Sequence, residues 1–427
     1  MTSSATKDFK GRPIVVVTGV GVVSSLGQGV DDNWSALTGG QSGIHTIERF
    51  ATDGLRTKVA GTVDFMKLEN HSAPDLTYAL ADAALDEAVG TSGLKMGDFP
   101  GPLFVASPPV EMEWQHRFEL DAEIPVSGLE GYARLLEVAR EKPHEKLYEL
   151  LQFGRTADRL ADKFGTRGLP ISLSTACASG ATAVQLGMEA IRRGETAAAL
   201  CVGTDGSVTM EALIRFSLLS ALTTQNDIPE KAAKPFSKDR DGFVMAEGAG
   251  ALVLESLESA QARGATVLAV LRGCGEKADH FHRTRSSPDG SPVIAAVNRA
   301  LDDAGVSFED IDYINAHGTS TPENDRMEYN SLKEVFGDAI HSTAISSNKS
   351  MIGHTLTAAG AIEAVFSVLT LKNGRIPPTI NYDTPDPDIP LDVVPFKARD
   401  AAVNNVLSNS FGFGGQNACL VLSNDIN

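Results

Sequence analysis

Residues 174–180 read Ser-Thr-Ala-Cys-Ala-Ser-Gly, and they join two apolar runs that predict buried elements. Residues 170–174 are typical of a buried strand, and residues 178–193 are typical of a buried helix. Cys177 is therefore expected at a strand-to-helix turn, where free N–H groups and the positive helix end favour a thiolate and bind an oxyanion. Most unpaired cysteines are core residues, so this pattern alone leaves a nucleophile and a core side chain both open.

A second half of the chain echoes the first. Ala-Leu-Asp-Glu-Ala at residues 84–88 recurs as Ala-Leu-Asp-Asp-Ala at 300–304, and each copy is followed by a loop and a strand-like run. The apolar helix bounded by glycines at 180 and 194 has a counterpart bounded by glycines at 360 and 374. Matching features in the same order indicate a duplicated half rich in βαβ units.

Two histidines lie in turns of the second half that correspond, by the duplication, to the region around Cys177. Thr357 occupies the position that matches Cys177, so only the first half carries a nucleophile there. His317 follows the strand-like run 313–316, and His354 precedes the second buried helix. The carboxyl ends of strands are where open α/β sheets place their sites. A lone histidine in a turn is usually a hydrogen-bonding turn residue, but two of them opposite Cys177 favour a functional role.

Composition narrows the classes of partner. The chain has 427 residues and a net charge of −18, which argues against nucleic acid or an anionic membrane as the main partner. An acidic partner would need a local basic patch. No apolar run approaches the length of a membrane span, and residues 1–8 lack the apolar core of a signal peptide. We therefore expect a cytoplasmic protein without membrane insertion.

The other cysteines and the histidine-rich loop predict neither a disulfide framework nor a metal site. Cys201 and Cys419 lie inside apolar runs, which indicates core filling, and Cys274 has no catalytic context. The Asp-His-Phe-His sequence at 279–282 resembles a metal pair, but no third ligand cluster accompanies it. We interpret it as a polar loop near the site.

Further helices and strands are predicted from the spacing of apolar residues and from the glycine and proline residues that bound each run. We expect a helix over 74–90 and a strand over 103–106, and then an inserted, largely helical region of mixed charge over about 107–154. The glycine-containing stretch 18–27 imitates a dinucleotide fingerprint, but a serine holds the place of the third glycine, so we interpret it as a tight turn with close backbone packing. The remaining strands are predicted at 13–17, 197–202, 243–254, 267–271 and 313–316.

Four blocks of this sequence resemble the signature blocks of one family. They are Thr-Ala-Cys-Ala-Ser-Gly at 175–180, Asn-Ala-His-Gly-Thr-Ser-Thr-Pro at 315–322, Asn-Lys-Ser-Met-Ile-Gly-His at 348–354, and Asn-Ser-Phe-Gly-Phe-Gly-Gly-Gln-Asn at 409–417. Together they resemble the elongating β-ketoacyl-[acyl-carrier-protein] synthases, the Cys-His-His condensing enzymes of type II fatty acid synthesis. The resemblance covers about residues 13–422 and is broken over 107–154.

The resemblance implies an α/β, thiolase-like fold. This fold has two duplicated βαβαβαββ halves in five layers, α-β-α-β-α, and is usually a homodimer. On this basis we divide the chain into a flexible tail at 1–12, an N-terminal half at 13–266 that holds the nucleophile and the insertion, and a C-terminal half at 267–427 that holds both catalytic histidines.

The resemblance also implies a reaction, a decarboxylative Claisen condensation of an acyl chain with a malonyl thioester. Cys177 would carry the acyl group, activated by a thiol pKa that the helix end lowers, and the N–H groups of Cys177 and Phe413 would form the oxyanion hole. His317 and His354, as neutral imidazoles, would donate from Nε2 to the enolate. Lys349 would set the charge and hydrogen bonding around His354.

The remaining implied residues surround this centre. Glu363 would be a buried structural acid on the Lys349 side, and Thr319 and Thr321 would bind the pantetheine amides. Phe216 would line the acyl pocket, and Phe413 would gate it. No metal, nucleotide or other cofactor is implied, and the substrates are acyl and malonyl thioesters on the phosphopantetheine of an acyl carrier protein.

Alternatives remain open. Two of them are disfavoured: a thiolase would need a second catalytic cysteine near the C-terminus, whereas Cys419 lies inside a strand-like run, and a chain-initiating synthase would carry Asn in place of His354. A polyketide-type ketosynthase, or a largely non-catalytic partner subunit of a condensing heterodimer, shares the same blocks. Two departures from the family favour a synthase specialised for a dedicated carrier or for an unusual, very long acyl chain. One is the 107–154 region, which has Pro108 and Pro109 where the family has glycines. The other is Ser220, which stands in place of the docking arginine. A surface elaboration without bearing on the substrate is the alternative interpretation of that region.

Overall fold

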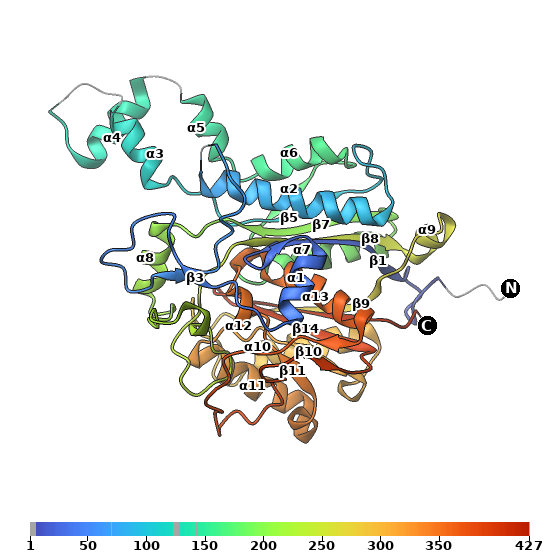
Figure 1. Cartoon of the computed structure of the whole chain (residues 1–427). Coiled ribbons are helices and arrows are strands. Elements are labelled where there is room, and N and C mark those ends of the chain that lie inside the picture. The colour runs from blue at the N-terminus through green and yellow to red at the C-terminus, as the bar shows by residue number, and fades with distance from the viewer. Residues whose placement is uncertain (1–5, 70, 123–127, 142–143, 427) are drawn as a thin grey trace.

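The chain repeats one order of elements twice. The structure is a computed structural model that describes residues 6–69, 71–122, 128–141 and 144–426. Both runs have the order βαβαβαββ, so the predicted fold class is confirmed (Figure 1). The first run consists of β1 (Val15–Ser24), α2 (Ala73–Ser92), β5 (Leu103–Ala106), α6 (Arg155–Phe164), β6 (Ile171–Leu173), α7 (Ser179–Arg192), β7 (Ala198–Asp205) and β8 (Gly248–Ser256). The second consists of β9 (Ala269–Ala278), α10 (Ser291–Ala304), β10 (Tyr313–Asn315), α11 (Pro322–Phe336), β11 (Ala344–Ser346), α13 (Ala359–Asn373), β14 (Asn405–Phe411) and β15 (Gln416–Ser423).

Shorter helices and strands are added to these two runs. The additional helices are α1 (Val30–Thr38), α3 (Trp114–Ala122), α4 (Gly131–Glu141), α5 (Glu145–Leu150), α8 (Met210–Leu218), α9 (Leu257–Ala262) and α12 (Lys349–Ile352). The additional strands are β2 (Gly27–Gln28), β3 (His45–Thr46), β4 (Val59–Ala60), β12 (Arg375–Ile376) and β13 (Arg399–Asp400). Single turns of 3₁₀-helix lie at 229–231, 308–310, 337–341 and 356–358.

Each run contributes five strands in the same spatial order. The main sheet has the strand order β11-β10-β14-β15-β9-β1-β8-β7-β5-β6, with β2 paired to β1. Strands β1 and β9 join the two halves through three antiparallel residue pairs. Counted from its outer edge toward the middle of the sheet, each half has its third, second, fourth, fifth and first strands in that order. The duplication seen in the sequence is therefore also a duplication of the strand topology.

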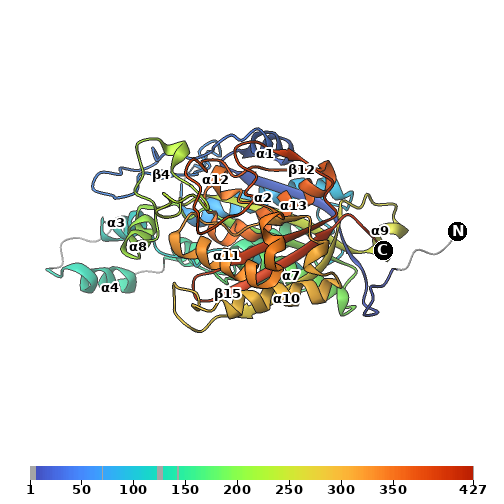
Figure 2. The same ribbon diagram turned by 90° about the horizontal axis from the view of Figure 1, so that it is seen from below.

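Two buried helices separate the two halves of the sheet. Helix α7 packs on β7, α13 packs on β8 and β14, and the two helices contact each other. Helices α2 and α6 cover the outer face of the first half, while α10 and α11 cover that of the second (Figures 1 and 2). The central contact requires small residues, since a Cβ at Gly180 would lie 2.4 Å from the Ala361 nitrogen. The result is five layers, α-β-α-β-α.

Three predicted elements differ from the structure. Residues 18–24, predicted as a turn, continue strand β1, and their close packing on α2 is confirmed because Cβ atoms at Gly19 and Gly21 would lie 2.1 and 2.0 Å from carbonyl oxygens of that helix. The strand predicted to be buried at 170–174 is β6, at the end of the sheet, where Ile171 is 44% exposed. The strand predicted from residue 243 begins at 248, since 243–247 form a loop with isolated bridges.

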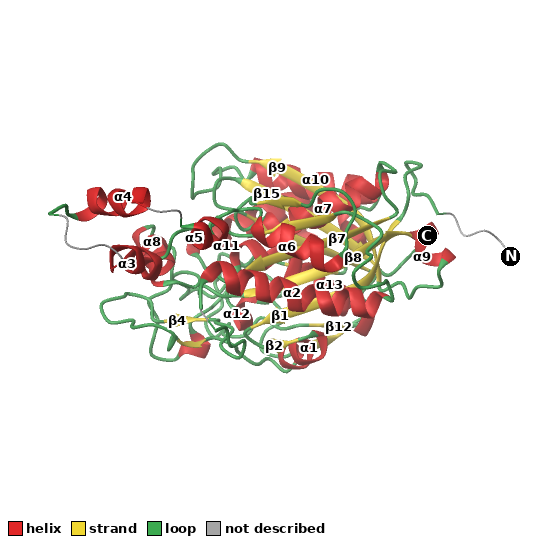
Figure 3. Ribbon diagram, turned by 90° about the horizontal axis from the view of Figure 1, so that it is seen from above, coloured by secondary structure: helices red, strands yellow, loops and turns green. Residues whose placement is uncertain are grey.

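The inserted region projects from the body of the molecule. Helices α3 and α4 pack on each other and extend beyond the layers (Figures 1 and 3). Several large apolar side chains of this region are exposed: Trp114, Phe118, Leu129, Tyr132, Leu136, Tyr148 and Phe153. Residues 123–127 and 142–143 of the predicted insertion lie outside the described residues. The predicted helical character of the described part is confirmed.

The N-terminal residues that the structure describes contact the second half. Arg12 forms an ion pair with Asp303 at 2.6 Å, and Lys7 bridges to Pro13. Residues 1–5 of the predicted tail lie outside the described residues. Within the described ranges, no helix combines the length and the apolar content needed to cross a bilayer.

Candidate active site

Cys177 sits in a tight connection between β6 and α7. Ala176 adopts a positive φ of 50°, and the Ser179 hydroxyl donates to the Ala176 carbonyl at 2.6 Å while accepting from the Thr175 N–H at 2.7 Å. These bonds hold Cys177 two residues before the first residue of α7, with the residue 9% exposed. The predicted strand-to-helix turn is thereby confirmed.

The loop after β14 places a backbone donor on the cysteine. The Phe413 N–H donates to the Cys177 sulfur. A Cβ at Gly412 would lie 2.9 Å from the Thr175 carbonyl oxygen and 3.2 Å from the Cys177 nitrogen, so only glycine permits this approach. The structure therefore brings together the two residues whose N–H groups were predicted to form the oxyanion hole.

The expected lowering of the thiol pKa is wrong for this arrangement. Burial raises the pKa of Cys177 to about 11, which outweighs the Phe413 N–H and the charge of Lys349, both of which lower it. The sulfur is enclosed between the halves, and its desolvation penalises the thiolate more than the nearby donors stabilise it. Cys177 is therefore a protonated thiol at neutral pH.

This protonation state predicts how the free protein reacts with an alkylating reagent. Because only the thiolate is nucleophilic, the rate of Cys177 modification by iodoacetamide should rise about ten-fold per pH unit from pH 7 to 10. Modification followed by peptide mass spectrometry at each pH gives the profile. A plateau below pH 8 would contradict the raised pKa and restore the sequence-based expectation of a helix-lowered value.

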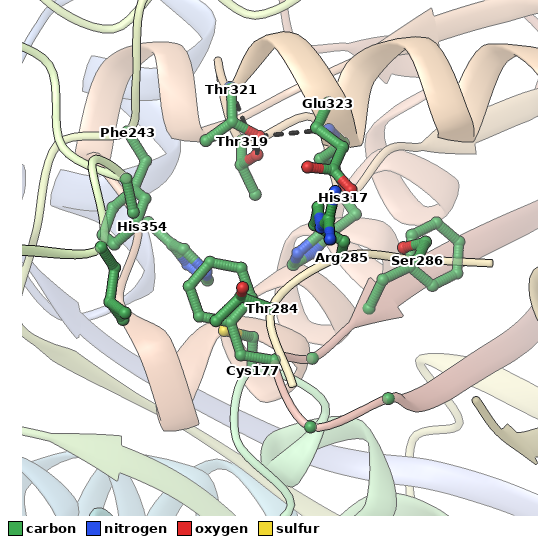
Figure 4. A pocket seen from close by; sticks show the side chains of 18 of the residues that line it. Cys177, Phe243, Thr284, Arg285, Ser286, His317, Thr319, Thr321, Glu323 and His354 are labelled. Atoms are coloured by element: carbon green, nitrogen blue, oxygen red, sulfur yellow. Dashed lines mark hydrogen bonds between the residues drawn. The ribbon is translucent and has the colours of Figure 1, made fainter. Parts of the chain in front are cut away.

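The two predicted histidines face each other beside the cysteine (Figure 4). The His317 and His354 rings lie edge to face with centroids 5.3 Å apart, and both residues are 2% exposed. Burial, together with the charge of Lys349, holds the pKa of each imidazole well below its usual range. Both rings are therefore neutral near pH 7, as predicted.

Lys349 makes its hydrogen-bonding contacts with His317 rather than His354, which corrects that part of the predicted role, whereas its charge does act on His354 as predicted. Its Nζ donates to the His317 carbonyl oxygen at 2.7 Å and lies 3.4 Å from His317 Nδ1. It also forms a buried ion pair with Glu363, so that acid lies on the Lys349 side as expected. An ammonium group facing Nδ1 leaves the ring proton on Nε2, and this tautomer directs a donor away from the lysine.

Sequence reasoning missed a second buried acid. The Glu328 carboxylate accepts the N–H groups of His317 at 2.8 Å and Gly318 at 2.7 Å, and the Asn409 amide at 3.2 Å. Burial raises the pKa of Glu328 to about 7. The sequence does hold a signal, because Glu328 falls four residues before Leu332 on the buried side of helix α11. An acid on an apolar helix face normally has a buried partner.

Asp205 was also missed. This fully buried carboxylate, at the end of β7, accepts the N–H of Thr357 at 3.1 Å and its hydroxyl at 2.7 Å. Thr357 is the counterpart of Cys177, so in the second half the equivalent position holds a structural hydrogen bond instead of a nucleophile.

Two cavities meet at the cysteine. One, of about 370 Å³, is lined by both histidines, Thr319 and Thr321, whose hydroxyls lie 2.9 Å apart. The other, of about 710 Å³, extends away from the histidines. The residues shared by both linings are Cys177, Phe216, Leu219, Leu356 and Phe413. The predicted substrate-binding side chains therefore all lie on this junction or on the smaller cavity.

The loop predicted to lie near the site does so. Asp279 and His282 line the smaller cavity together with residues 284–286 (Figure 4). Phe216, predicted to line the acyl pocket, contacts Phe243 at a centroid distance of 5.4 Å, and Phe243 in turn packs on the His354 ring. These aromatic side chains form one wall around the histidine.

The predicted insertion lines the larger cavity. Residues 107–114 form part of its wall, together with Arg117 and residues 150, 152 and 153. Helix α8 supplies another part of the wall, and the Trp114 N–H donates to Glu211 on that helix at 2.5 Å. The first eight residues of this region thus lie on the wall of a cavity that also reaches Cys177, and their bearing on the substrate stays a prediction.

Comparisons with known proteins agree with this geometry. Residues 12–83 and 141–260 match the β-ketoacyl synthase N-terminal domain, and residues 268–383 match the β-ketoacyl synthase C-terminal domain. A 3-oxoacyl-[acyl-carrier-protein] synthase 2 from Coxiella burnetii is 38% identical over 96% of this chain and 98% of its own length. A protein of the same name from Staphylococcus aureus is 37% identical over 95% of this chain and all of its own length.

Two solved ketosynthase structures are similar to this chain over nearly its whole length. A type II polyketide ketosynthase in the AntDE:AntF complex, bound to a hexaketide and its acyl-carrier protein, is 34% identical, with a TM-score of 0.83 over 96% of this chain and 99% of its own. The ishigamide ketosynthase/chain length factor is 37% identical, with a TM-score of 0.82 over the same shares.

Proposed function

The chain belongs to the β-ketoacyl synthase family of condensing enzymes, and on that premise we propose that it elongates acyl chains on a carrier protein. The reaction joins a Cys177-bound acyl group to malonyl-[acyl-carrier-protein] and yields 3-oxoacyl-[acyl-carrier-protein] and CO₂. The observation that carries the proposal is the position of Cys177 under the Phe413 N–H, at the junction of two cavities and beside two neutral histidines.

The first step transfers the acyl group. The Cys177 sulfur attacks the thioester carbonyl, the bond to the pantetheine sulfur breaks, and the departing pantetheine thiolate takes up the proton that Cys177 loses. The N–H groups of Cys177 and Phe413 stabilise the oxyanion of the tetrahedral intermediate. Because the free thiol has a raised pKa, proton loss accompanies attack rather than preceding it.

The second step forms the new carbon–carbon bond. The malonyl group loses CO₂, and the electron pair of the broken bond forms an enolate, to which His317 and His354 donate hydrogen bonds. The enolate carbon attacks the Cys177 thioester, the cysteine sulfur leaves as a thiolate, and this thiolate takes up the one proton that the condensation consumes from solvent water. Neutral imidazoles suit this step, because cations would hold the malonyl carboxylate in place instead of the enolate oxygen.

The proposal requires no metal, nucleotide or other cofactor, since loss of CO₂ drives the condensation. Its partner is an acyl carrier protein, and its expected location is the cytoplasm. We also propose a homodimer. Strand β6 ends the sheet with Leu169 and Ile171 exposed beside it, by 90% and 44%, and such an uncovered strand edge favours pairing with a second copy.

The direct test is product formation. Purified protein incubated with a short acyl-carrier protein and malonyl-carrier protein should form a β-ketoacyl product, detected by mass spectrometry of the carrier. Absence of product with the protein alone, and its appearance only when a second condensing subunit is added, would favour the heterodimer-partner alternative instead.

A polyketide-type ketosynthase is the second candidate, because one solved relative described above is the ketosynthase of a type II polyketide system and the other is named a ketosynthase/chain length factor. The two functions differ in the acyl groups they accept. A fatty acid enzyme should condense a saturated acyl chain and stop at one round without reductases. A polyketide enzyme should extend the unreduced β-ketoacyl product again, which adds further two-carbon units to the carrier.

We further propose that the larger cavity receives the acyl chain and that the insertion adapts it to a long or unusual one. Replacing Val110 by Trp should narrow the cavity. Overpacking costs about 1–3 kcal/mol, so kcat/KM should fall roughly 5- to 150-fold for long acyl chains and stay unchanged for the shortest. The measurement is a chain-length series on the housekeeping carrier and on a candidate dedicated carrier.

Val110→Ala, which leaves the cavity open and adds no polar group, serves as the control for the substitution itself. Equal activity of Val110→Trp and the parent protein at every chain length would show that the chain does not enter this cavity. Preference of the parent protein for medium chains on the housekeeping carrier would end the specialised interpretation.

A further inference from the structure

The smaller cavity has one strongly basic side chain on its rim. Arg285 lies in the loop between β9 and α10, is exposed, and lines the cavity with Thr284 and Ser286 (Figure 4). It is the one lysine or arginine among the described residues that line this cavity.

The acidic residues of the same wall are engaged in holding the loop. The Asp279 carboxylate accepts the N–H groups of Phe281 at 2.9 Å and Ser287 at 2.7 Å. The Glu323 carboxylate accepts the Ser286 N–H, and burial raises its pKa while the charge of Arg285 opposes that rise. Both acids therefore brace the backbone on either side of Arg285.

Arg285 itself has no partner at ion-pair or hydrogen-bond distance within the described ranges. Its guanidinium is thus available to an incoming anion. Ser220, which occupies the position where the family resemblance implies a carrier-docking arginine, lines the same cavity without charge. The positive charge at this entrance is consequently supplied by a different residue from the one the resemblance implies.

We propose that Arg285 binds the phosphodiester of the phosphopantetheine arm, an inference that rests on the proposed function. With the thioester at Cys177 and the arm along Thr319 and Thr321, the phosphate end of the arm lies toward the exposed rim. A planar guanidinium matches the geometry of a phosphate and forms paired, charge-assisted hydrogen bonds with it. Arg285 would therefore contribute to recognition of the arm itself, independently of the surface of the carrier protein.

Direct binding tests this without turnover. Calorimetric titration of the full protein with 4′-phosphopantetheine and with pantetheine, which lacks only the phosphate, isolates the contribution of the phosphate. Arg285→Ala should raise the Kd for 4′-phosphopantetheine about ten-fold and leave the Kd for pantetheine unchanged. Arg285→Lys should recover part of the loss, and added salt should weaken the parent protein more than Arg285→Ala. Arg167→Ala, an exposed arginine that lines neither cavity, is the matched control.

Several results would overturn the proposal. Equal binding of the two compounds by the parent protein, or an equal loss for both in Arg285→Ala, would remove the phosphate as the ligand. In assays of the half-reactions, a loss of rate in Arg285→Ala that is confined to malonyl thioesters would assign Arg285 to the malonyl carboxylate. A loss of rate seen only with intact carrier protein would assign it to acidic side chains of the carrier. A phosphate-dependent Kd in a protein that forms no β-ketoacyl product would keep this inference while refuting the proposed function.

Discussion

Cys177→Ala should form no acyl-enzyme and lose condensation by about 10⁴- to 10⁶-fold, the range expected when a covalent nucleophile is removed. The sulfur lies at the meeting point of the two cavities, and it accepts the Phe413 N–H. The methyl group of alanine fills part of its space and leaves the donor in place. Malonyl-carrier protein should therefore still bind with nearly unchanged affinity, because only the first step uses sulfur.

Intact-mass spectrometry after incubation with acyl-carrier protein gives the readout. The parent protein should gain the mass of one acyl group and Cys177→Ala none. Cys274→Ala is the matched control, since Cys274 is also buried but lines neither cavity. An acyl adduct on Cys177→Ala would refute the nucleophile assignment, and loss of the adduct in Cys274→Ala would show that the assay reports on folding instead.

The duplication could be predicted from the sequence because it follows from local chemistry. Glycine at 180 and at 360 permits α7 and α13 to touch, and each helix ends near a glycine that adopts positive φ. A residue that must be small to permit a close contact between helices, or must be glycine to adopt a positive φ, can be recognised from a single sequence. The same holds for Gly412, whose contact with the Cys177 turn tolerates no side chain.

What could not be predicted depends on the spatial neighbours of a residue. Residues 170–174 are apolar enough for a buried strand, yet β6 lies at the sheet edge, and no local signal separates an edge strand from a central one. Lys349 is nearer to His354 along the chain, but folding points its ammonium group at His317. The pKa of Cys177 depends on enclosure by both halves, and a helix end read from the sequence gives only one of the opposing contributions.

Removing either histidine should separate decarboxylation from acyl transfer. His317→Ala and His354→Ala should still form the Cys177 acyl-enzyme, whereas CO₂ release should fall about 10²–10³-fold, the typical cost of one lost donor to an oxyanion. Cys177→Gln is the suitable background for the CO₂ assay, because its amide mimics the acylated cysteine and is expected to release CO₂ without condensation.

The neutrality of both rings adds a second, independent expectation. Since the pKa of each imidazole lies well below 6.5, both donors stay uncharged above that pH, and CO₂ release by Cys177→Gln should be flat from pH 6.5 to 8. His341→Ala, an exposed histidine bonded to the Pro390 carbonyl, is the control and should leave CO₂ release unchanged. Unchanged CO₂ release in both active-site variants, or a midpoint near pH 7 in the profile, would contradict a pair of neutral imidazole donors. Loss of acylation together with decarboxylation in His354→Ala would instead indicate that this ring also takes part in the first step, since its Nδ1 is buried without a partner within the described residues.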